Sequence, residues 1–458
     1  MAAIDATKNG GVTPSGYPSS LKTTPDKYTS LGDLLDYQKP DNRDLLIKTF
    51  GDQGITGFLQ LTGATRSAGT NDEVQYWEEG RLHKAVDYTS VTNSVVTVAD
   101  NDPAVVRLND VLLFEDGSRA VVTDQDTSGT TFTVARLDGT AAGDFDIATA
   151  GKAAIVGNIY AQGSGQPSEF YQTEVVKRTN PFFITKETYH VTGSQATNIG
   201  WINIGNGDYR WYVKGEMDTR KRFMNQREMM MLLGQKPNVT SGDGVDDLTI
   251  NGGAITGSEG YFAAVENRGI TTTGTFGDGA GFADIDEIIF ELDKQGAPAE
   301  YAMYVDTATS LAIDDMLASG IATQTTAGLP GQFGAFQNSA DMAVNLGFKS
   351  FTRGSYTFHK HGWKLLSDPT LLGAFTTKPY KGAMVPMTQV ADAKTGVKAP
   401  ALEMNYKEVN GYNREMEHWV EGGGVLGFAT NDQDVAKFHY RSEANLITRA
   451  ANQHVVLK

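Results

Sequence analysis

The sequence predicts a mixed α+β protein, in which helices and strands occupy separate stretches of the chain. Three observations lead to this class. Residues 206–236 have the composition of one long helix. Residues 100–162 contain short runs of β-branched residues separated by Gly- and Asp-containing turns. Residues 237–400 combine capped helices with the apolar run YAMYV at 301–305, which is typical of a buried strand.

The composition limits the classes of function that this chain can have. The 458 residues carry a net charge of −16 and include no cysteine. The lack of cysteine excludes disulfides, Cys-ligated zinc and cysteine nucleophiles, and it agrees with folding in a reducing cytoplasm. Without a long basic cluster, tight or sequence-specific nucleic-acid binding is not expected, although an acidic surface can surround nucleic acid because it repels phosphates. We also expect no signal peptide and no membrane span, since no apolar run approaches ~18 residues.

Residues 1–50 are predicted to form an N-terminal arm with short helices. Residues 1 to about 28 mix Gly, Ser, Thr, Pro and Lys irregularly, as extended or disordered tails do. Ser30 can cap a first short helix, and Asp41 or Asn42 can cap a second.

Residues 51–99 are predicted to form the first part of an extended ribbon. In the segment GTNDEVQYWEEGRLHKAVDYTSV, two strands are predicted to join in a hairpin around Glu79 and Gly80. Neither face is cleanly apolar, so the hairpin gains little by folding onto its own chain, and we expect it to lie on a neighbouring chain. One predicted face holds Val74, Tyr76 and Glu78, and the other holds Gln75, Trp77 and Glu79. The side chains expected to make intersubunit contacts are Tyr76, Trp77, Glu78, Glu79 and Arg81.

Residues 100–162 are predicted to be a small β-barrel inserted into this ribbon. Turn residues at 115–117, 126–129 and 138–139 separate its strands. Because the strands are short and the turns well formed, we expect the barrel to fold autonomously. The expected strands are Val105–Phe114, Arg119–Asp124, Thr130–Arg136 and Ala153–Ala161.

Residues 163–205 are predicted to return as extended strands that lead into the long helix at 206–236. Asn206 or Asp208 can begin this helix, and Gly234 can end it.

The apolar residues of the long helix are predicted to form two stripes with a charged row between them. Two stripes indicate a helix covered on more than one side, and arginines that pair with carboxylates distant in the sequence. The plain alternative is an amphipathic core helix with solvated charges. The first stripe is Tyr209, Val213, Met217, Met224 and Met231, and the second is Tyr212, Phe223 and Met230. The charged row, also expected to contact other subunits, is Glu216, Arg220 and Arg227, and the i,i+4 spacing predicts the pairs Glu216–Arg220 and Asp218–Arg222.

The region 237–400 is predicted to be an α+β domain. After a Gly-, Thr- and Asp-rich stretch, Asp284 with Glu287 is predicted to form an acidic capping box at the start of a helix. Asp306 or Thr307 is predicted to cap the next helix after the buried strand.

Gly320 is predicted to end that second helix. Beyond it, strands alternate with loops, and residues 401–458 are predicted to close the fold as antiparallel strands.

Three motifs that can carry chemistry have stronger structural interpretations. DQDTSG at 124–129 matches half of a calcium loop, but its twelfth position is Ala135 and a hairpin turn is favoured. His359 and His361 share one face of a strand without a local carboxylate to complete a metal site. GDGAGF at 277–282 lacks the spacing of a dinucleotide-binding loop. We therefore expect no catalytic residue, cofactor or metal, although the many carboxylates leave open a hydrolase that uses two of them.

The order of these parts resembles that of the major capsid proteins of tailed bacteriophages. In that family an N-terminal arm, an extended loop, a spine helix, an axial domain and peripheral-domain strands follow one another. The segment NPFFITKETYHVTGSQATN before a helix ending EMMMLLGQ resembles a capsid subgroup with a V-S/T-G-T/S strand and a K-R-D-I-E-x-x-L-L-x-G helix. Asn225, Gln226 and Arg227 depart from that subgroup, which is usually more acidic there. NLGFKSFTRGSYTFH and VRLNDVLLFEDGSRAVVT are similar to the coat proteins of crAss-like phages of gut Bacteroidetes.

The resemblance implies a structural, non-enzymatic role. Copies of the chain would assemble as hexamers and pentamers into an icosahedral head that encloses double-stranded DNA without sequence-specific binding. The resemblance also implies a virion location, assembly in the host bacterial cytoplasm, and portal and head-decoration proteins as partners. Residues 237–400 would be the axial-type domain and residues 401–458 the peripheral strands.

The alternative is a non-catalytic β-rich surface protein or a tail or spike component. Such a protein would share the Gly- and Thr-rich composition. The single long charged helix in mid-chain and the lack of a signal peptide favour the capsid interpretation.

Overall fold

The structure is a computed structural model, and it describes most of the chain beyond residue 64. The predicted arm and helices of residues 1–50, residues 51–64 and the start of the long helix at 206–210 lie outside the described residues. So do the turn at 126–129 and nearly all of GDGAGF. The described segments are 65–99, 106–125, 130–141, 143–198, 211–236, 249–250, 253–254, 257–273, 282–326, 349–387, 390–391 and 398–458.

The chain divides into two compact units. Beyond residue 64, the smaller unit contains Thr188–Thr219 and Val420–Phe438, and the larger unit contains the remainder. Four elements continue from one unit into the other. They are β10 (Phe183–Thr192), α3 (Trp211–Leu233), β23 (Glu417–Gly422) and β24 (Val435–Thr448).

A five-stranded sheet contains three of these shared elements. At one edge, the short strand β1 (Thr65–Ser67) runs parallel to β20 (Leu402–Tyr406), which is antiparallel to β24. Strands β10 and β23 also pair with β24. The antiparallel pairing of β20 with β24 confirms the prediction for the start of 401–458.

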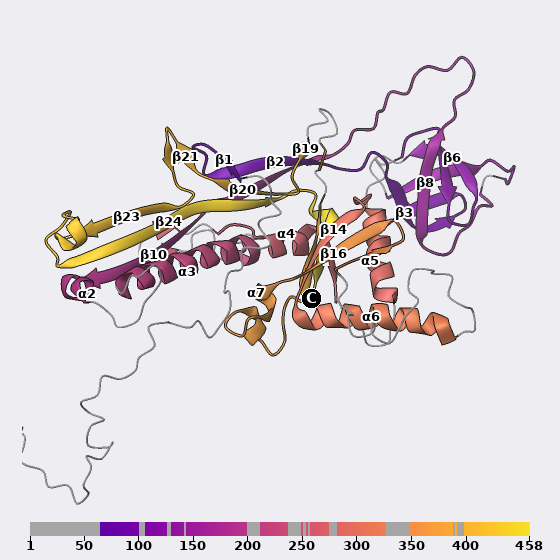
Figure 1. Ribbon diagram of the computed structural model, residues 1–458. Helices are drawn as coiled ribbons and strands as arrows, with labels where there is room; N and C mark the ends of the chain where they lie inside the picture. The colour runs from indigo at the N-terminus through magenta and orange to yellow at the C-terminus, as the bar shows by residue number, and fades with distance from the viewer. Residues whose placement is uncertain are drawn as a thin grey trace, which may run out of the picture. The chain divides into compact units, whose positions relative to one another are not determined.

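Within each unit, one close contact packs a part of helix α3 against a neighbouring strand (Figure 1). In the smaller unit, a Cβ on Gly215 would lie 2.5 Å from the hydroxyl oxygen of Tyr189. In the larger unit, the buried ring of Phe223 lies 5.8 Å from that of Tyr440. The predicted helix is thus present and continuous over the part of it that the structure describes.

Within a single copy of the chain, each predicted stripe of α3 is only partly buried, and the coverage expected from neighbouring copies stays a prediction. Met217 is 63% and Met230 40% exposed, whereas Phe223 and Met231, one from each stripe, are buried. The buried residues of α3 are Thr219, Phe223, Glu228, Met231 and Leu232, and the pairs 219/223 and 228/232 have the i,i+4 spacing. The prediction grouped residues by apolar character, but a helix packs along rows of i and i+4 positions.

The larger unit also contains a mixed six-stranded sheet that is buried on both faces. Tyr301, Met303 and Val305 point to one hydrophobic cluster, and Ala302 and Tyr304 to another. Burial on both faces explains the uninterrupted apolar run at 301–305. The strand order is β13 (Ile270–Thr272), β25 (Val455–Leu457), β17 (Gly382–Pro386), β14 (Glu300–Val305), β16 (Tyr356–Gly362) and β15 (Ser350–Arg353).

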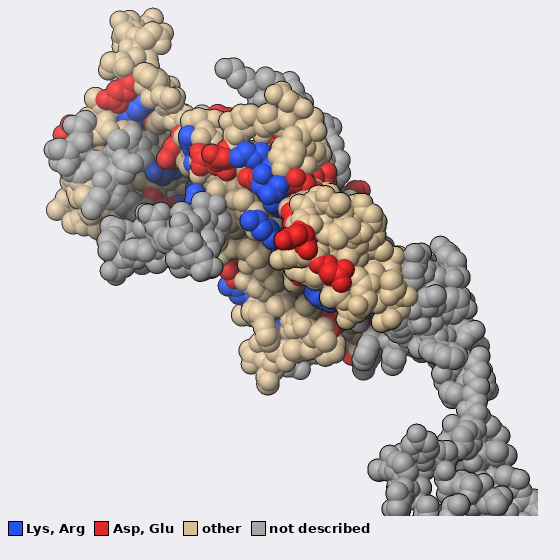
Figure 2. Space-filling view, turned by 90° about the vertical axis from the view of Figure 1, so that its left-hand side faces the viewer, with Lys and Arg blue, Asp and Glu red and all other residues tan. Residues whose placement is uncertain are grey.

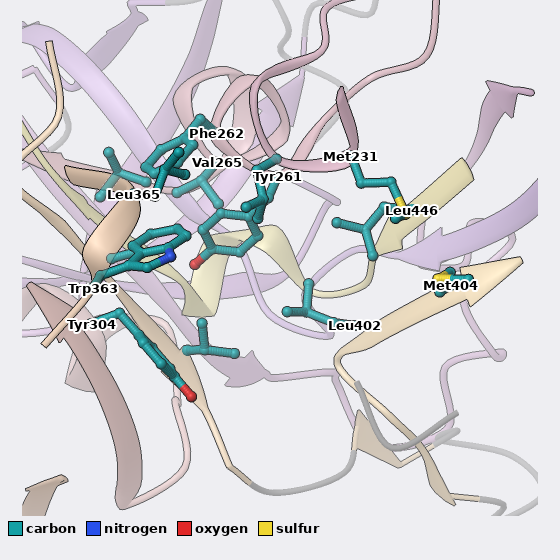
Figure 3. Close-up of a cluster of buried hydrophobic side chains, with 14 of the residues drawn as sticks. Met231, Tyr261, Phe262, Val265, Tyr304, Trp363, Leu365, Leu402, Met404 and Leu446 are labelled. Atoms are coloured by element: carbon teal, nitrogen blue, oxygen red, sulfur yellow. The ribbon is translucent and has the colours of Figure 1, made fainter. Parts of the chain in front are cut away.

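Different helices supply the two clusters. α5 (Ala283–Lys294) and α6 (Thr307–Thr326) contribute to the first, and α4 (Tyr261–Arg268) to the second. Figure 3 shows the second cluster, where Trp363 lies near Phe262 and Tyr304, and Leu402 and Leu446 enter from the five-stranded sheet. This shared core joins the two sheets within the larger unit.

The inserted barrel is present as a closed six-stranded barrel. Its order is β3 (Ala85–Thr92), β4 (Val95–Val98), β7 (Thr131–Arg136), β6 (Arg119–Gln125), β5 (Asp110–Phe114) and β8 (Gly151–Asn158). Alternate residues of each strand point into its own core, where the rings of Tyr88 and Phe145 lie within 5.4 Å and 5.3 Å of that of Phe114. Strands β5, β6, β7 and β8 correspond to the four strands expected after residue 100, but the first of them begins at Asp110 rather than at residue 105.

The predicted hairpin around Glu79 and Gly80 is wrong. Strand β2 (Glu73–Glu79) pairs instead with β9 (Val175–Pro181), and the strand that follows it belongs to the barrel. The barrel therefore begins at residue 85 rather than at 100. The reason is that a period-two pattern defines the faces of a strand, not its partner.

The helices of the six-stranded region also differ from prediction. Helix α5 begins at Ala283 after Phe282, and no side chain caps it, so the capping box of Asp284 is wrong. Helix α6 runs through Gly320 to Thr326, because one glycine costs a helix only about 1 kcal/mol. Asp306 does cap α6 as predicted, since its Oδ1 accepts from the amide of Thr309 at 2.8 Å.

Two further elements were not predicted. Helix α4 lies within the stretch that was predicted to be Gly-, Thr- and Asp-rich and without a helix. The last strand, β25, pairs within the six-stranded sheet rather than with the other closing strands. The remaining described elements are short. They are α2 (Gly193–Thr197), β11 (Thr249–Ile250), β12 (Gly253–Ala254), α7 (Lys364–Ser367), η4 (Leu372–Ala374), β18 (Val390–Ala391), β19 (Lys398–Ala399), β21 (Glu408–Val409), β22 (Tyr412–Asn413), η5 (Val425–Gly427) and η6 (Ala451–Gln453).

Candidate interaction surface

Strand β2 presents two different faces. The alternation of exposed and half-buried positions confirms the predicted division of its side chains. Trp77, on the outer face, is 65% exposed, and Val175 on the paired strand is 54% exposed. The inner residues are Val74, Tyr76 and Glu78, and the outer residues are Gln75, Trp77 and Glu79.

A tyrosine holds the inner face of β2 to the larger unit. Oη of Tyr76 donates to the backbone oxygen of Thr448 and accepts from Nη2 of Arg268, both at 3.3 Å. Burial raises the pKa of Tyr76 to about 12, so the hydroxyl remains a donor at neutral pH. Arg268 also forms an ion pair with Glu259, with 3.0 Å between Nη2 and Oε2. The sequence did not identify Arg268 or Glu259, because only the fold brings them to Tyr76.

Glu78 forms an ion pair across the two strands of the ribbon. Its Oε2 lies 3.1 Å from Nε of Arg178 on β9. Both side chains are partly exposed, so the pair stabilises the ribbon by at most about 1 kcal/mol.

Arg81 contacts its own chain just beyond the end of β2. Its Nη2 donates to the backbone oxygen of Lys294 at 2.6 Å and to Oε1 of Gln295 at 3.0 Å. These acceptors are at the C-terminal end of α5, where a guanidinium is favourable because the helix dipole is negative there. Glu79 is exposed at the last position of β2.

The charged row of α3 does not form one cluster. Glu216 belongs to the smaller unit and is half-buried, whereas Arg220 belongs to the larger unit and is exposed. Nη1 of Arg227 donates to the backbone oxygen of Glu415 at 2.9 Å, so this distant partner is a carbonyl group rather than the predicted carboxylate. Burial lowers the pKa of Arg227, but an arginine stays charged at neutral pH. Asp218 pairs with Lys214 rather than with Arg222.

The two histidines whose spacing could bind a metal ion lie in a strand of the six-stranded sheet. His359 and His361 lie in β16, where the ring of His361 stacks 5.2 Å from that of Tyr304. Within the described segments, no group of three His, Asp or Glu side chains is arranged to hold a metal ion. Among the helices in those segments, none is both long and apolar enough to span a membrane.

Charges of both signs mix on the surface. Figure 2 shows basic and acidic side chains beside one another on the face drawn there. Such a face offers complementary pairing with another protein, which fixes specificity more than affinity.

Comparisons with known proteins give low similarity. No family model matches the chain, and no curated protein matches its sequence. Among solved structures, the capsid of the cyanophage P-SCSP1u is 10% identical, covering 97% of this chain and 98% of that one with a TM-score of 0.41. The capsid of a native GTA particle is 7% identical over 94% and 99% of the two chains, with a TM-score of 0.41. A chain from Microbacterium phage Oxtober96 is 11% identical over 94% and 98%, with a TM-score of 0.40. These scores are too low to establish a shared fold.

Proposed function

We propose that this chain is the major capsid protein of a tailed bacteriophage, a non-enzymatic subunit of the head. The observation that carries the proposal is the asymmetry of the β2–β9 ribbon. Its inner face is fixed to its own chain through Tyr76, whereas its outer face leaves Trp77 65% exposed. A two-stranded ribbon is marginal alone, and tryptophan is a frequent anchor of interfaces, so a second protein surface accounts for this arrangement.

The order of elements supports the same proposal. The ribbon takes the place of an extended loop, α3 that of a spine helix, and the six-stranded sheet with its helices that of an axial-type domain. The barrel is an insertion between the two ribbon strands. Copies of the chain assemble as hexamers and pentamers into an icosahedral shell around double-stranded DNA. The net charge of −16 keeps that DNA from adhering to the wall.

The proposed contacts between copies involve both the ribbon and α3. Trp77 and Glu79 face outward from one copy, while Tyr76, Glu78 and Arg81 position the ribbon. Glu216, Arg220 and Arg227 add charged contacts along the helix. The particle is a virion assembled in the bacterial cytoplasm, with portal and head-decoration proteins as partners, and the source is a crAss-like phage.

Negative-stain electron microscopy of the purified protein tests this function. A capsid subunit should form closed shells, sheets or rings of regular size. A preparation that stays monomeric at all concentrations, or that forms fibres or trimeric spikes, would contradict the capsid role and favour a tail or surface component.

A further inference from the structure

The turn that joins β23 to β24 lies within the smaller unit and is closed by several hydrogen bonds (Figure 1). We call residues 422–430 the tip turn. The amide of Gly422 donates to Oγ1 of Thr430 at 2.9 Å, and its backbone oxygen accepts from the amide of Thr430 at 2.6 Å. The amide of Gly424 donates to the backbone oxygen of Phe428 at 2.6 Å. These bonds fix the conformation of the turn and therefore the positions of its side chains.

Leu426 adopts a backbone conformation that is unfavourable for its own side chain. Its φ of 56° and ψ of 19° lie in the left-handed region, where an L side chain is strained. The neighbouring Gly424 and Gly427 have φ of 90° and 86°, and glycine is the residue expected at such positions. Among the described non-glycine residues with positive φ, Leu426 alone has a large apolar side chain. Strain of this kind points to a role of the side chain beyond the local fold.

The tip turn presents apolar side chains to solvent beside carboxylates. Leu426 is 41% and Phe428 40% exposed in a single copy of the chain. Residues 420–436 contain three carboxylates and no Lys or Arg, and two of these carboxylates, Asp432 and Asp434, are exposed. A surface that complements the tip turn is therefore apolar at its centre and basic around it.

Helix α3 has a surface of that kind around Met217, whose side chain is 63% exposed. Lys214 and Arg220 lie three residues before and three residues after it, so both are its neighbours on the helix surface. Lys214 forms an ion pair with Asp218, and Arg220 is exposed. We call Lys214, Met217 and Arg220 the Met217 region. The other large apolar residues that are exposed on the described α-helices lack a cation at one or both of these positions, and they are Met230, Phe290 and Leu311.

The charges favour a second copy of the chain as the partner of the tip turn. Two tip turns would repel each other, because each carries exposed carboxylates. The tip turn of one copy and the Met217 region of another are instead complementary in charge and apolar at their centres. A contact between two different surfaces is heterologous, and contacts of this type can close into rings.

We propose that the tip turn of one copy packs on the Met217 region of a neighbouring copy, so that Leu426 and Phe428 cover Met217. The carboxylates of Asp432 and Asp434 then face the cations beside Met217. The inference rests on the proposed function, because it assigns one of the contacts between subunits of a shell. It explains why the chain keeps a leucine at a position where glycine would be less strained.

Crosslinking between single-cysteine variants tests the proposal. The chain has no cysteine, so Leu426→Cys and Met217→Cys each introduce one thiol. Particles assembled from equal amounts of the two variants are treated with a short bis-maleimide and digested, and mass spectrometry should find a peptide pair that joins positions 426 and 217. Because each chain carries one thiol, this pair forms only between copies. The matched control mixes Leu426→Cys with Phe290→Cys, a helix residue that is 65% exposed, and should not give the corresponding pair.

A second variant, Leu426→Gly, separates a role in assembly from a role in the fold. Glycine relieves the strain at this φ, so the unfolding temperature of the unassembled chain should stay equal or rise. Loss of the side chain should raise the concentration needed for assembly about tenfold, the equivalent of about 1.4 kcal/mol. Asn410→Gly, at an exposed turn position with φ 49°, is the control and should leave assembly unchanged.

The outcomes separate this inference from the proposed function. A 426–217 pair that is absent from the control mixture supports the inference. Equal yields in both mixtures, or no pair from variants that assemble, would overturn it and leave the capsid role intact. The same holds for a Leu426→Gly chain that unfolds at a lower temperature and assembles as readily as wild type, and this result decides if the cysteine variants do not assemble. Wild-type chains that form no particles would refute the proposed function and this inference with it.

Discussion

Nδ2 of Asn445 donates a hydrogen bond to the backbone oxygen of Asn180 at 2.9 Å, although 265 residues separate them. Asn180 also donates through its own Nδ2 to the backbone oxygens of Leu446 at 2.8 Å and Glu259 at 3.0 Å. Its Oδ1 accepts from Oγ of Ser258 at 3.1 Å and from the amide of Glu259 at 2.8 Å. The buried side chain of Asn180 therefore links the end of β9 to β24 and to the residues just before α4.

Asn180→Ala should destabilise the larger unit by about 3 kcal/mol, because it strands several buried groups at once. Urea unfolding of the unassembled chain, followed by tryptophan fluorescence, measures the loss. The exposed Asn158→Ala is the control and should change the free energy of unfolding by less than about 0.5 kcal/mol. Equal stability of the two variants would show that the network around Asn180 is dispensable.

Gly215→Ala should destabilise the smaller unit, even though alanine is the better helix former by about 1 kcal/mol. The new methyl group would lie 2.5 Å from the hydroxyl oxygen of Tyr189, so the ring must move at a cost of about 1–3 kcal/mol. Combining Gly215→Ala with Tyr189→Ala should remove this penalty, and a double-mutant cycle measured by urea unfolding quantifies it. Additive effects would contradict the contact.

Because of Asp306, the free energy of unfolding should decrease at acidic pH. Burial alone would raise the pKa of its carboxyl group, but the hydrogen bonds from Lys378 and Thr309 outweigh burial and lower the pKa. The stabilisation is therefore complete above about pH 4, the unfolded pKa, and is lost as pH falls through the lower folded pKa. Asp306→Asn should flatten the decline of the unfolding free energy below about pH 4, and an unchanged slope would contradict this assignment.

Local patterns predicted much of the fold because their causes are local. Asp306 caps α6 within one turn, and the run at 301–305 records burial on both faces of one strand. The alternation around Trp77 likewise predicted which side chains face outward. Each of these features depends on residues close in sequence.

The features that the sequence did not predict depend on pairs of residues that are far apart in the sequence. The pattern of β2 could not reveal β9 as its partner, because the whole barrel lies between them. Arg268 reaches Tyr76 only in the folded chain, and Arg227 reaches a backbone oxygen of Glu415 that has no sequence signature. Helix α4 was missed because glycines at 260 and 269 flank its eight residues.

Removal of the barrel should leave the rest of the fold intact. The amide of Gly80 donates to the backbone oxygen of Glu174 at 2.8 Å, which continues the β2–β9 ladder up to the barrel. Replacing residues 81–173 with Asn-Gly should close the ribbon as a two-residue hairpin. Circular dichroism and gel filtration should show a folded, soluble chain, whereas an aggregated product would mean that the barrel supports the main core.

Trp77→Ala should abolish particle formation while leaving the unassembled chain folded. The side chain is 65% exposed, so its removal leaves no cavity, whereas truncating an interface anchor commonly costs about 2 kcal/mol or more at every contact. Thermal unfolding and circular dichroism of the unassembled chain should match wild type, and negative-stain microscopy should show no shells. Phe290→Ala on α5 is the matched control, because that ring is also 65% exposed, and we expect it to assemble. If Trp77→Ala instead lowers the unfolding temperature and still forms shells, Trp77 stabilises its own chain and the ribbon is not an intersubunit arm.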